Sequence, residues 1–400
     1  MSTFDITTTA RNSFPSLVTA PSPFFENAGG SQTLGTVITA IHAYLLTTNV
    51  QVLASNPVSD ISTDLVNAGT RAAAAFISTV PENIVIGAST TQLLANLSSA
   101  LSFPAGSEII ISKVDHEANI APWVRMAKRQ GLVVKWWNPA DLKRPAMTAE
   151  GLRPLLSDKT RLVAVTHCSN VLGVINPIRE IADLVHTIPG AMLCVDGVAM
   201  TAHRKIDVEA LGVDFYVWSW YKTFGPHIST LYARPAANKQ VEGLGHYFNP
   251  SETIGQKLGL AGASYELVAS LPKVVEYLEQ PGIWDAIASH EEALLKPLLD
   301  YLVSNPKITV HGETRADKAV RVPVLAFTVN AVPVETVRER LINEGYGLRV
   351  GHCYAKRCVA EVLGRGEEGV VRVSFVHYNT VEEVEGFVEA LKRVFAADDW

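Results

Sequence analysis

The feature that most constrains the fold is a regular alternation of apolar runs and helical segments between residues 84 and 233. Each run is almost continuously apolar, and stretches with helical periodicity separate one run from the next. Strands of this kind, separated by helices, indicate a parallel sheet that is covered on both faces. The runs expected to form the sheet are 84–86, 108–112, 132–137, 161–166, 191–195, 213–218 and a last strand that ends at Tyr232.

After about residue 240 the pattern changes and predicts a smaller α+β unit. A glycine-rich run at 255–262 does not follow a strand, so we reject a dinucleotide-binding Rossmann motif. The expected elements are a helix over 284–304, a strand over 321–330, a helix over 334–344, strands over 348–350 and 370–375, and a closing helix over 381–396. Since 400 residues favour two domains, we expect a large domain at 15–275 and a small one formed by 1–14 and 276–400.

Polar side chains stand at the ends of three of the predicted parallel strands. His116, Asn170 and Asp196 each follow or end an apolar run. Because the carboxyl ends of parallel strands meet at one edge of the sheet, these residues are expected to line a common ligand crevice.

A lysine and an aspartate near this edge suggest a specific chemistry. Lys222 follows a buried strand and stands among aromatic residues, where desolvation would lower its pKa and make it a nucleophile for Schiff bases. An acid that protonates a pyridine nitrogen, such as Asp196, and a lysine that forms an imine are the minimum that pyridoxal phosphate requires. A surface lysine and a helix-capping aspartate would explain these two residues equally well.

Two small-residue turns are further candidates. The turn 87–91 follows an apolar run and precedes a helical pattern, so its backbone N–H groups could bind a phosphate. An ordinary Ser/Thr helix cap is the alternative. The pair Gly29-Gly30 after Asn27 allows close backbone approach to a ligand, although an ordinary turn explains it as well.

Composition narrows the function classes. A net charge of −6 without a long basic run argues against nucleic-acid binding. No apolar stretch is long enough to span a bilayer and no signal peptide is visible, so we expect a cytoplasmic protein without a membrane partner. The four cysteines have no zinc-site spacing, and no metal site is expected.

The ordered set of motifs resembles the fold-type I, class V aminotransferases, and within them the cysteine desulfurase-like branch. The motifs lie at 115–119, 167–173, 195–197, 214–216, 219–222, 225–226, 372–374 and 378–380, so that the resemblance covers nearly the whole chain. It implies an α/β fold with a large, mostly parallel seven-stranded-type sheet domain, a smaller α+β C-terminal domain and pyridoxal 5'-phosphate as cofactor. It also implies a homodimer with shared active sites, in which the segments around His246 and 263–264 come from the partner.

The resemblance also implies roles for individual residues. Lys222 looks like the lysine that binds the cofactor, Asp196 like the partner of its ring nitrogen, and His116 like the imidazole that stacks on its ring and shuttles protons. Further cofactor-binding residues expected by resemblance are Thr90, Thr91, Asn170, Ser219 and Tyr221. The expected substrate-binding residues are Arg372, which suits a carboxylate, and Asn170, Asn27 and His352.

Three positions depart from the desulfurase pattern. Tyr354 stands where the family has its nucleophilic cysteine, and Cys353 falls one residue early. Ala199 replaces a glutamine and Tyr221 a histidine. These departures are similar to those of carbon–carbon bond-forming enzymes in fungal natural-product pathways, such as those of ustiloxin and loline.

Three functions remain open from the sequence. The first is an aldol- or Mannich-type reaction, decarboxylative or not, between an amino-acid-derived carbanion or enamine and an aldehyde or imine. The alternative is a cysteine desulfurase or C–S lyase with Cys353 as the sulfur acceptor. The third is a scaffold without activity, in which Lys222 does not bind the cofactor.

Overall fold

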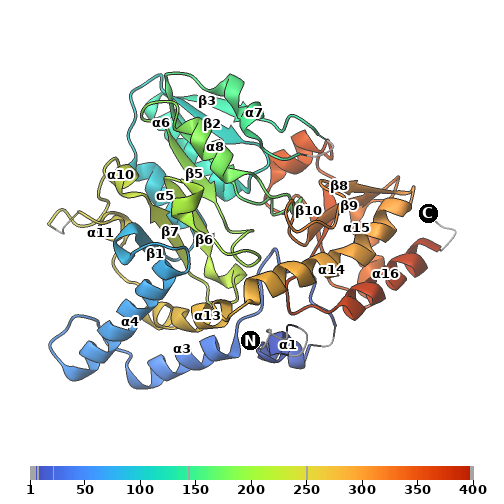
Figure 1. The fold of residues 1–400 in the computed structure, drawn as a ribbon, viewed down its shortest axis with the longest axis horizontal. Helices are drawn as coiled ribbons and strands as arrows, with labels where there is room; N and C mark the ends of the chain where they lie inside the picture. The colour runs from blue at the N-terminus through green and yellow to red at the C-terminus, as the bar shows by residue number, and fades with distance from the viewer. Residues whose placement is uncertain (1–5, 7–8, 21, 143–144, 249–250, 397–400) are drawn as a thin grey trace.

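A seven-stranded sheet forms the centre of the larger part of the molecule (Figure 1). The computed structural model describes the chain except residues 1–5, 7–8, 21, 143–144, 249–250 and 397–400. The strand order is β1-β7-β6-β5-β4-β2-β3. Only β7 runs antiparallel to its neighbours in this sheet, and the other pairings are parallel. The strands are β1 (Ile84–Gly87), β2 (Glu108–Ser112), β3 (Val133–Trp137), β4 (Thr160–Thr166), β5 (Met192–Asp196), β6 (Phe215–Ser219) and β7 (Ser229–Ala233).

Both faces of this sheet are buried, as the apolar runs predicted. Along β4, Val163 and Val165 belong to one hydrophobic cluster while Leu162 and Ala164 belong to another. Successive side chains of a strand point to opposite faces, so a run that is apolar throughout fills two cores. Helices α5 (Thr90–Ala100), α6 (Ala121–Gln130) and α11 (Ile254–Leu258) cover one face, and α4 (Pro57–Ala75), α8 (Ile178–Val185) and α13 (Leu271–Leu278) the other.

A four-stranded antiparallel sheet forms the smaller part, with the order β10-β11-β9-β8. Helices α14 and α16 lie side by side against it in Figure 1, and their leucines and phenylalanines share a core with the strands. The elements are α14 (Ile283–Ser304), β8 (Ile308–His311), β9 (Val324–Val329), α15 (Val334–Asn343), β10 (Arg349–Gly351), β11 (Val370–Ser374) and α16 (Val381–Ala396). The predicted fold class is confirmed, whereas the domain limits at residues 14 and 275 stay a prediction.

The remaining elements are short and connect or cover these two sheets. They are α1 (Thr9–Asn12), α2 (Pro15–Val18), α3 (Gly35–Thr47), η1 (Pro81–Asn83), η2 (Glu117–Asn119), α7 (Ala149–Leu152), η3 (Arg153–Leu155), α9 (Val208–Leu211), η4 (Trp220–Lys222), α10 (Pro235–Asn238), α12 (Tyr265–Ala269) and the π-helix η5 (Cys358–Val362).

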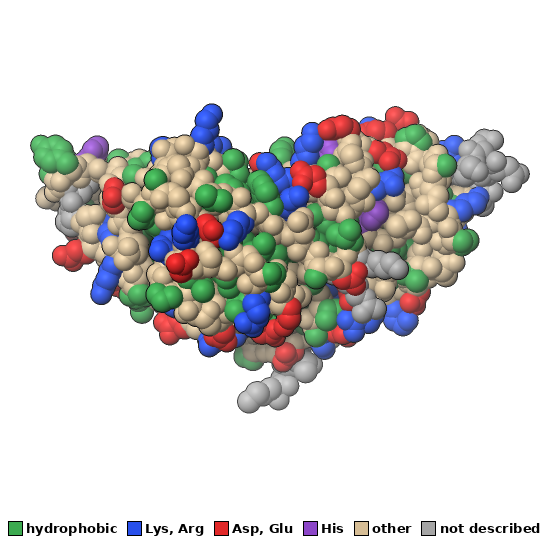
Figure 2. All heavy atoms as spheres, turned by 90° about the horizontal axis from the view of Figure 1, so that it is seen from above, with side chains coloured by type: hydrophobic (Ala, Val, Ile, Leu, Met, Phe, Trp, Pro, Cys, Tyr) green, Lys and Arg blue, Asp and Glu red, His purple; other side chains and the backbone are tan. Residues whose placement is uncertain are grey.

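The surface carries charges of both signs. On the face shown in Figure 2, basic and acidic side chains are interspersed rather than gathered by sign. Among the described helices, none is both long and apolar enough to cross a membrane.

Candidate active site

A cavity of about 740 Å³ opens where the carboxyl ends of the parallel strands face the smaller sheet. A second compartment of about 70 Å³ adjoins it and shares part of its lining, including His116, Asn170 and Lys222. The larger sheet therefore brings the predicted residues of its strand ends together, as the parallel topology requires. The small sheet adds Arg349 and Arg372 to the outer compartment, and the loop that follows β10 adds Cys353 and Tyr354.

Asp196, the last residue of β5, lies in the wall of the inner compartment and is almost fully buried. Its Oδ1 accepts a hydrogen bond from the Val198 N–H at 2.9 Å. Desolvation raises the pKa of this carboxyl to about 6, although the Val198 N–H and the charge of Lys222 act in the opposite direction. A buried carboxylate with so little compensation is suited to bind a cationic partner.

Lys222 is placed by a tightly anchored turn that follows β6. Trp220 is fully buried, and its indole N–H donates to the Thr230 hydroxyl at 2.8 Å. Desolvation and, to a lesser extent, the nearby Arg372 together lower the pKa of Lys222 to about 8, against the opposing charge of Asp196. Within the described part of the chain, its Nζ makes no hydrogen bond or ion pair and lies 5.9 Å from the Tyr221 ring centroid. A partly deprotonated amine is therefore available at the cavity wall.

His116 lies next to both compartments as the cap of η2. Its Nδ1 accepts the Ala118 N–H at 3.1 Å, which places the ring hydrogen on Nε2. Desolvation lowers its pKa to about 4, and the charges of Lys222 and Arg372 act in the same direction. The imidazole is thus neutral near neutral pH and can donate through Nε2.

The turn before α5 forms an ordinary helix cap, and phosphate binding by the same turn stays a prediction. Ser89 caps the helix by accepting the Gln92 N–H at 3.1 Å, so the ordinary capping role is present. The Thr90 hydroxyl lies 2.8 Å from that of Ser219, and both residues line the inner compartment with Thr91. The first N–H groups of a helix have no intrahelical acceptor, so this end of α5 can also hold an anion.

Tyr221 lines both compartments, as expected of a cofactor-binding residue. Its ring stacks on His227 with a centroid distance of 4.8 Å and an interplanar angle of 3°. Tyr221 replaces the histidine that the family has at this position, but another histidine, His227, lies beside it.

Arg372 and Asn170 form the candidate carboxylate clamp. Arg372 lies on β11 with 3% of its surface exposed, and its Nη1 donates to the Asn170 carbonyl at 3.1 Å. Its Nε is buried and has no hydrogen-bond partner among the residues that the structure describes. The Asn170 side chain donates to the Cys353 carbonyl at 2.9 Å. The guanidinium therefore keeps donors for a ligand, and an unpaired buried donor is costly unless one binds.

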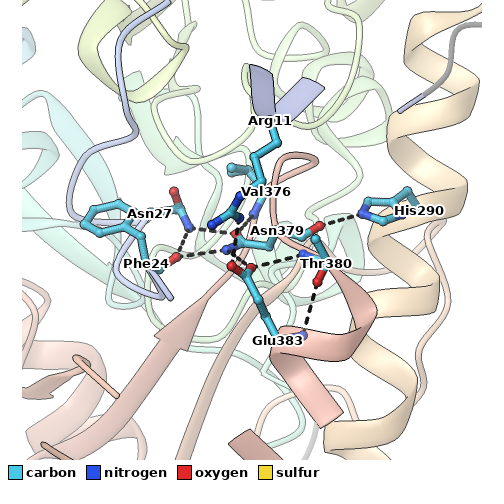
Figure 3. A network of polar contacts seen from close by, with 8 residues as sticks. All are labelled: Arg11, Phe24, Asn27, His290, Val376, Asn379, Thr380 and Glu383. Carbon is cyan, nitrogen blue, oxygen red and sulfur yellow. Dashed lines mark hydrogen bonds and ion pairs between the residues drawn. The ribbon is translucent and has the colours of Figure 1, made fainter. Parts of the chain in front are cut away.

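Two predicted substrate-binding residues do not line either of these compartments. The Asn27 side chain is used within the protein. Its Nδ2 donates to the Ser374 carbonyl at 2.9 Å, and Tyr378 donates to its Oδ1. The same Nδ2 also donates to Asn379 Oδ1 at 3.2 Å (Figure 3). His352 lies in a neighbouring cleft, where its ring is 2.7 Å from the Gly366 carbonyl. In this geometry Asn27 shapes the chain beside the cavity rather than reaching into it.

The loop that carries the family's cysteine is tied to the larger sheet. Besides the bond from Asn170 to the Cys353 carbonyl, the Glu117 N–H donates to the Tyr354 carbonyl at 2.8 Å. Cys353 and Tyr354 both have positive φ, 49° and 58°, which is uncommon for residues other than glycine. Burial raises the pKa of the Cys353 thiol, while the Tyr354 side chain remains largely exposed beside His116.

Sequence reasoning missed several charged residues of the cavity, including an ion pair between Glu26 and Arg349. Glu26 and Arg349 line the outer compartment, and Arg349 Nη1 lies 3.2 Å from Glu26 Oε1. Glu26 stands directly before Asn27 in the glycine-containing turn, and Arg349 begins β10. Only the pairing of distant segments reveals them, because neither lies at the end of a parallel strand.

The residues present fit the cofactor expected from the sequence. A free lysine amine, a buried carboxylate, a neutral imidazole and a hydroxyl-rich helix N-terminus surround the same inner compartment. Among the described residues, no group of three or more His, Cys, Asp or Glu side chains is arranged to hold a metal ion.

The chain is similar to proteins named as aminotransferase-like or cysteine desulfurase-like and to solved cysteine desulfurases. The chain is 51% identical over 391 residues to the aminotransferase-like protein FGM3 of Gibberella zeae, covering 96% of this chain and 97% of that protein. It is 43% identical over 335 residues to the cysteine desulfurase-like protein ustD of Aspergillus flavus, covering 81% and 76%. The apo cysteine desulfurase from Thermococcus onnurineus NA1 has the same fold, with a TM-score of 0.89, 24% identity, and coverage of 98% and 99% of the two chains.

The family model for class V aminotransferases matches residues 23–387, from the turn before Glu26 into the last helix. This match confirms the resemblance that the motifs indicated, together with its cofactor, pyridoxal 5'-phosphate. The chain belongs to the aminotransferase class V family and to its cysteine desulfurase-like members.

Proposed function

We propose that this protein joins an amino acid to an aldehyde or imine through a new carbon–carbon bond, with pyridoxal phosphate as cofactor. Its similarity to fungal cysteine desulfurase-like and aminotransferase-like proteins supports a role in fungal-type secondary metabolism, including alkaloid formation. The observation that carries the proposal is the loop at 351–355, where an exposed tyrosine replaces the sulfur-accepting cysteine and the neighbouring thiol is buried.

Each cofactor group has a candidate partner in the inner compartment. Lys222 would hold the cofactor covalently through Nζ, and Asp196 would bind its ring nitrogen. His116 would lie against the ring, while Ser219 and the start of α5 would hold the phosphate. When bound, the cofactor supplies an electron sink for negative charge that develops at the substrate Cα.

The protein's own residues direct the reaction. Arg372 binds the substrate carboxylate and thereby orients the Cα bonds relative to the ring. Lys222, with its pKa lowered to about 8, removes or returns the proton at Cα. Neutral His116 donates a hydrogen from Nε2 to an oxygen that gains charge. These roles require no nucleophilic cysteine.

Replacing Cys353 with serine is expected to leave turnover within about twofold, because the thiol's raised pKa makes it a poor nucleophile. The measurement is carbon–carbon bond formation with the best substrate pair, compared with sulfide release from cysteine. The matched variant Cys358→Ser tests a second buried thiol of the same segment. Loss of all turnover on Cys353→Ser alone, with the fold intact, would favour a sulfur-transfer enzyme.

The alternative function, a cysteine desulfurase or C–S lyase, is supported by the position of one cysteine. Cys353 lines the cavity near Lys222 and Arg372, so one residue of slip in the loop could present its thiol to a substrate. If purified protein released sulfide or alanine from cysteine about as fast as it used its best substrate pair, this alternative would hold.

One experiment separates these functions. The holoprotein is incubated in heavy water with aspartate, cysteine or other amino acids, each with and without a panel of aldehydes. We expect cofactor spectral changes and deuterium at Cα, or loss of a carboxylate, and an adduct only when an aldehyde is present. Sulfide formation without an adduct would contradict the proposal.

We also propose a homodimer with shared active sites. Tyr247 and Phe248 are 99% and 70% exposed in the segment around His246, and α3 and α4 expose Leu46 and Ile61. Exposed apolar groups of this size suit a protein interface. Replacing Tyr247 and Phe248 with serine is expected to yield monomers in sedimentation experiments, whereas an unchanged dimer would remove this segment from the interface.

The pH dependence of cofactor capture tests Lys222 separately. Only the deprotonated amine attacks an aldehyde, so with a pKa of about 8 the capture rate should rise with pH and level off above that value. Below pH 8 the expected slope is about tenfold per pH unit. Stopped-flow absorbance on cofactor-free protein measures it, and a rate that still climbs above pH 10 would indicate an unperturbed lysine.

A further inference from the structure

A carboxylate of the protein itself, that of Glu26, lies close to Arg372, the residue proposed to bind the substrate carboxylate. Glu26 Oε1 lies 3.2 Å from Arg349 Nη1 and 3.9 Å from Arg372 Nη2. All three side chains line the outer compartment. The first distance allows a hydrogen bond, whereas the second is too long for one. Glu26 is therefore hydrogen-bonded to Arg349 and forms only a long ion pair, without a hydrogen bond, with Arg372.

The two arginines are placed together by the register of the small sheet. Arg349 on β10 pairs directly with Arg372 on β11. Side chains of directly paired residues lie on the same face of a sheet, and like charges in such positions repel. A carboxylate between them offsets this repulsion, which explains why a third charged group is built into the site.

The backbone fixes Glu26 at this point. Glu26 forms a β-bridge with Ser374, two residues beyond Arg372. Gly29 leaves room for the carboxylate, because a Cβ at that position would lie only 2.8 Å from Glu26 Oε1. The present position of the carboxylate, beside both arginines, therefore depends on the absence of a side chain at residue 29.

While Glu26 is hydrogen-bonded to Arg349, the Arg372 guanidinium keeps hydrogen-bond donors that are not used. Its Nη1 donates to the Asn170 carbonyl, but its buried Nε has no hydrogen-bond partner in the described part of the chain. A carboxylate that bound Nε and Nη2 would satisfy the guanidinium in the bidentate manner it favours. Both a substrate carboxylate and Glu26 itself have this chemistry.

We propose that Glu26 is an internal competitor for the substrate's carboxylate at Arg372 and that Arg349 is the positioning residue that keeps it away. The inference rests on the proposed role of Arg372 as the carboxylate clamp. With Glu26 on Arg349, two cations and one anion leave a net charge of +1, which one substrate carboxylate neutralises. Without Arg349, Glu26 turns to Arg372 and blocks the clamp.

The inference predicts effects of opposite sign for the two partners of one ion pair. Arg349→Gln is expected to weaken L-alanine binding to the holoenzyme about tenfold, since Glu26 then occupies Arg372. Glu26→Gln is expected to tighten it about threefold. The double variant should bind alanine at least as well as the unmodified protein, because it lacks the competitor.

The dissociation constants are measured by titration of the cofactor's visible absorbance. Ethylamine, which is alanine without its carboxylate, serves as the matched ligand and should bind equally to all variants. Arg393→Gln, which breaks the remote Arg393–Glu344 ion pair of 2.7 Å, is the control variant and should change neither constant.

The outcomes separate this inference from the proposed function. If Arg372→Gln does not weaken alanine relative to ethylamine, the clamp assignment itself fails. If Arg372→Gln weakens alanine but Arg349→Gln does not, the clamp stands and the competitor role of Glu26 is wrong. If the double variant binds alanine as weakly as Arg349→Gln does, the inference is also wrong, because this result would indicate that Arg349 binds the substrate carboxylate directly.

Discussion

Replacing Lys222 with alanine is expected to reduce turnover by about 10,000-fold or more, because one side chain both holds the cofactor and moves the proton at Cα. The variant should still fold, since the Lys222 amine makes no hydrogen bond or ion pair within the described structure and the turn is anchored by Trp220. Activity assays and the visible spectrum of protein saturated with pyridoxal phosphate provide the measurement.

Two comparisons make this result specific. Lys222→Arg keeps the positive charge near Asp196 but cannot bind an aldehyde covalently, so it should lose activity to a similar degree. Lys257→Met removes a different buried lysine, which donates to the Asn238 carbonyl at 2.6 Å, and should lower stability while sparing the spectrum. Retention of a lysine-bound cofactor spectrum in Lys222→Ala would contradict the site.

Replacing Asp196 with asparagine is expected to change activity and stability in opposite directions. Activity should fall about 1,000-fold, because asparagine cannot compensate a protonated ring nitrogen electrostatically. The cofactor-free protein should become more stable above pH 6 by about 3 kcal/mol, since the buried charge, whose pKa rises from 3.8 to about 6, is removed. Thermal unfolding of cofactor-free protein and steady-state kinetics measure the two effects.

The pH window follows from the direction of this shift. A carboxyl whose pKa is raised on folding costs nothing below its unfolded pKa, and the cost grows until the pH passes the folded value. The stabilisation by Asp196→Asn should thus be full above pH 6 and shrink toward pH 4. Asp214→Asn is the contrasting control, because Asp214 lies 2.8 Å from His186 and 3.4 Å from Arg234 and its loss should destabilise the protein. Equal destabilisation by both variants would contradict the account.

The large sheet could be predicted from the sequence because burial on two faces leaves nearly continuous apolar runs. The run 108–112 matches β2 at both ends, whereas the run predicted to start at Val213 begins as β6 at Phe215. The helices of the smaller unit were also predicted closely: the one expected over 284–304 begins at Ile283, and the one expected over 334–344 ends at Asn343.

Elements without a strong pattern were missed. The strand β8 has four residues, of which only Ile308 is buried, and the helix α12 has five residues, of which only Val268 is buried. The helix α13 was also missed, although its buried residues Leu271, Val274 and Leu278 have helical spacing. Their positions depend on packing against α4 and the second sheet, which no local pattern encodes.

The residues of the candidate site show the same difference between those that a local pattern predicts and those that only long-range contacts place. Strand ends and motifs identified Lys222, Asp196 and His116, because topology alone brings those positions together. No local pattern predicts that the Asn27 amide binds Ser374 and Asn379, or that Glu26 pairs with Arg349. Those contacts join segments more than 300 residues apart.

The most direct test of the account is to identify the residue that carries the cofactor. The holoprotein is reduced with borohydride, digested, and its peptides are sequenced by mass spectrometry. We predict that the pyridoxyl group is found on Lys222 and on no other lysine in significant amount. A label on another residue, or no label on protein that is saturated with pyridoxal phosphate, would contradict the assignment of this cavity as the active site.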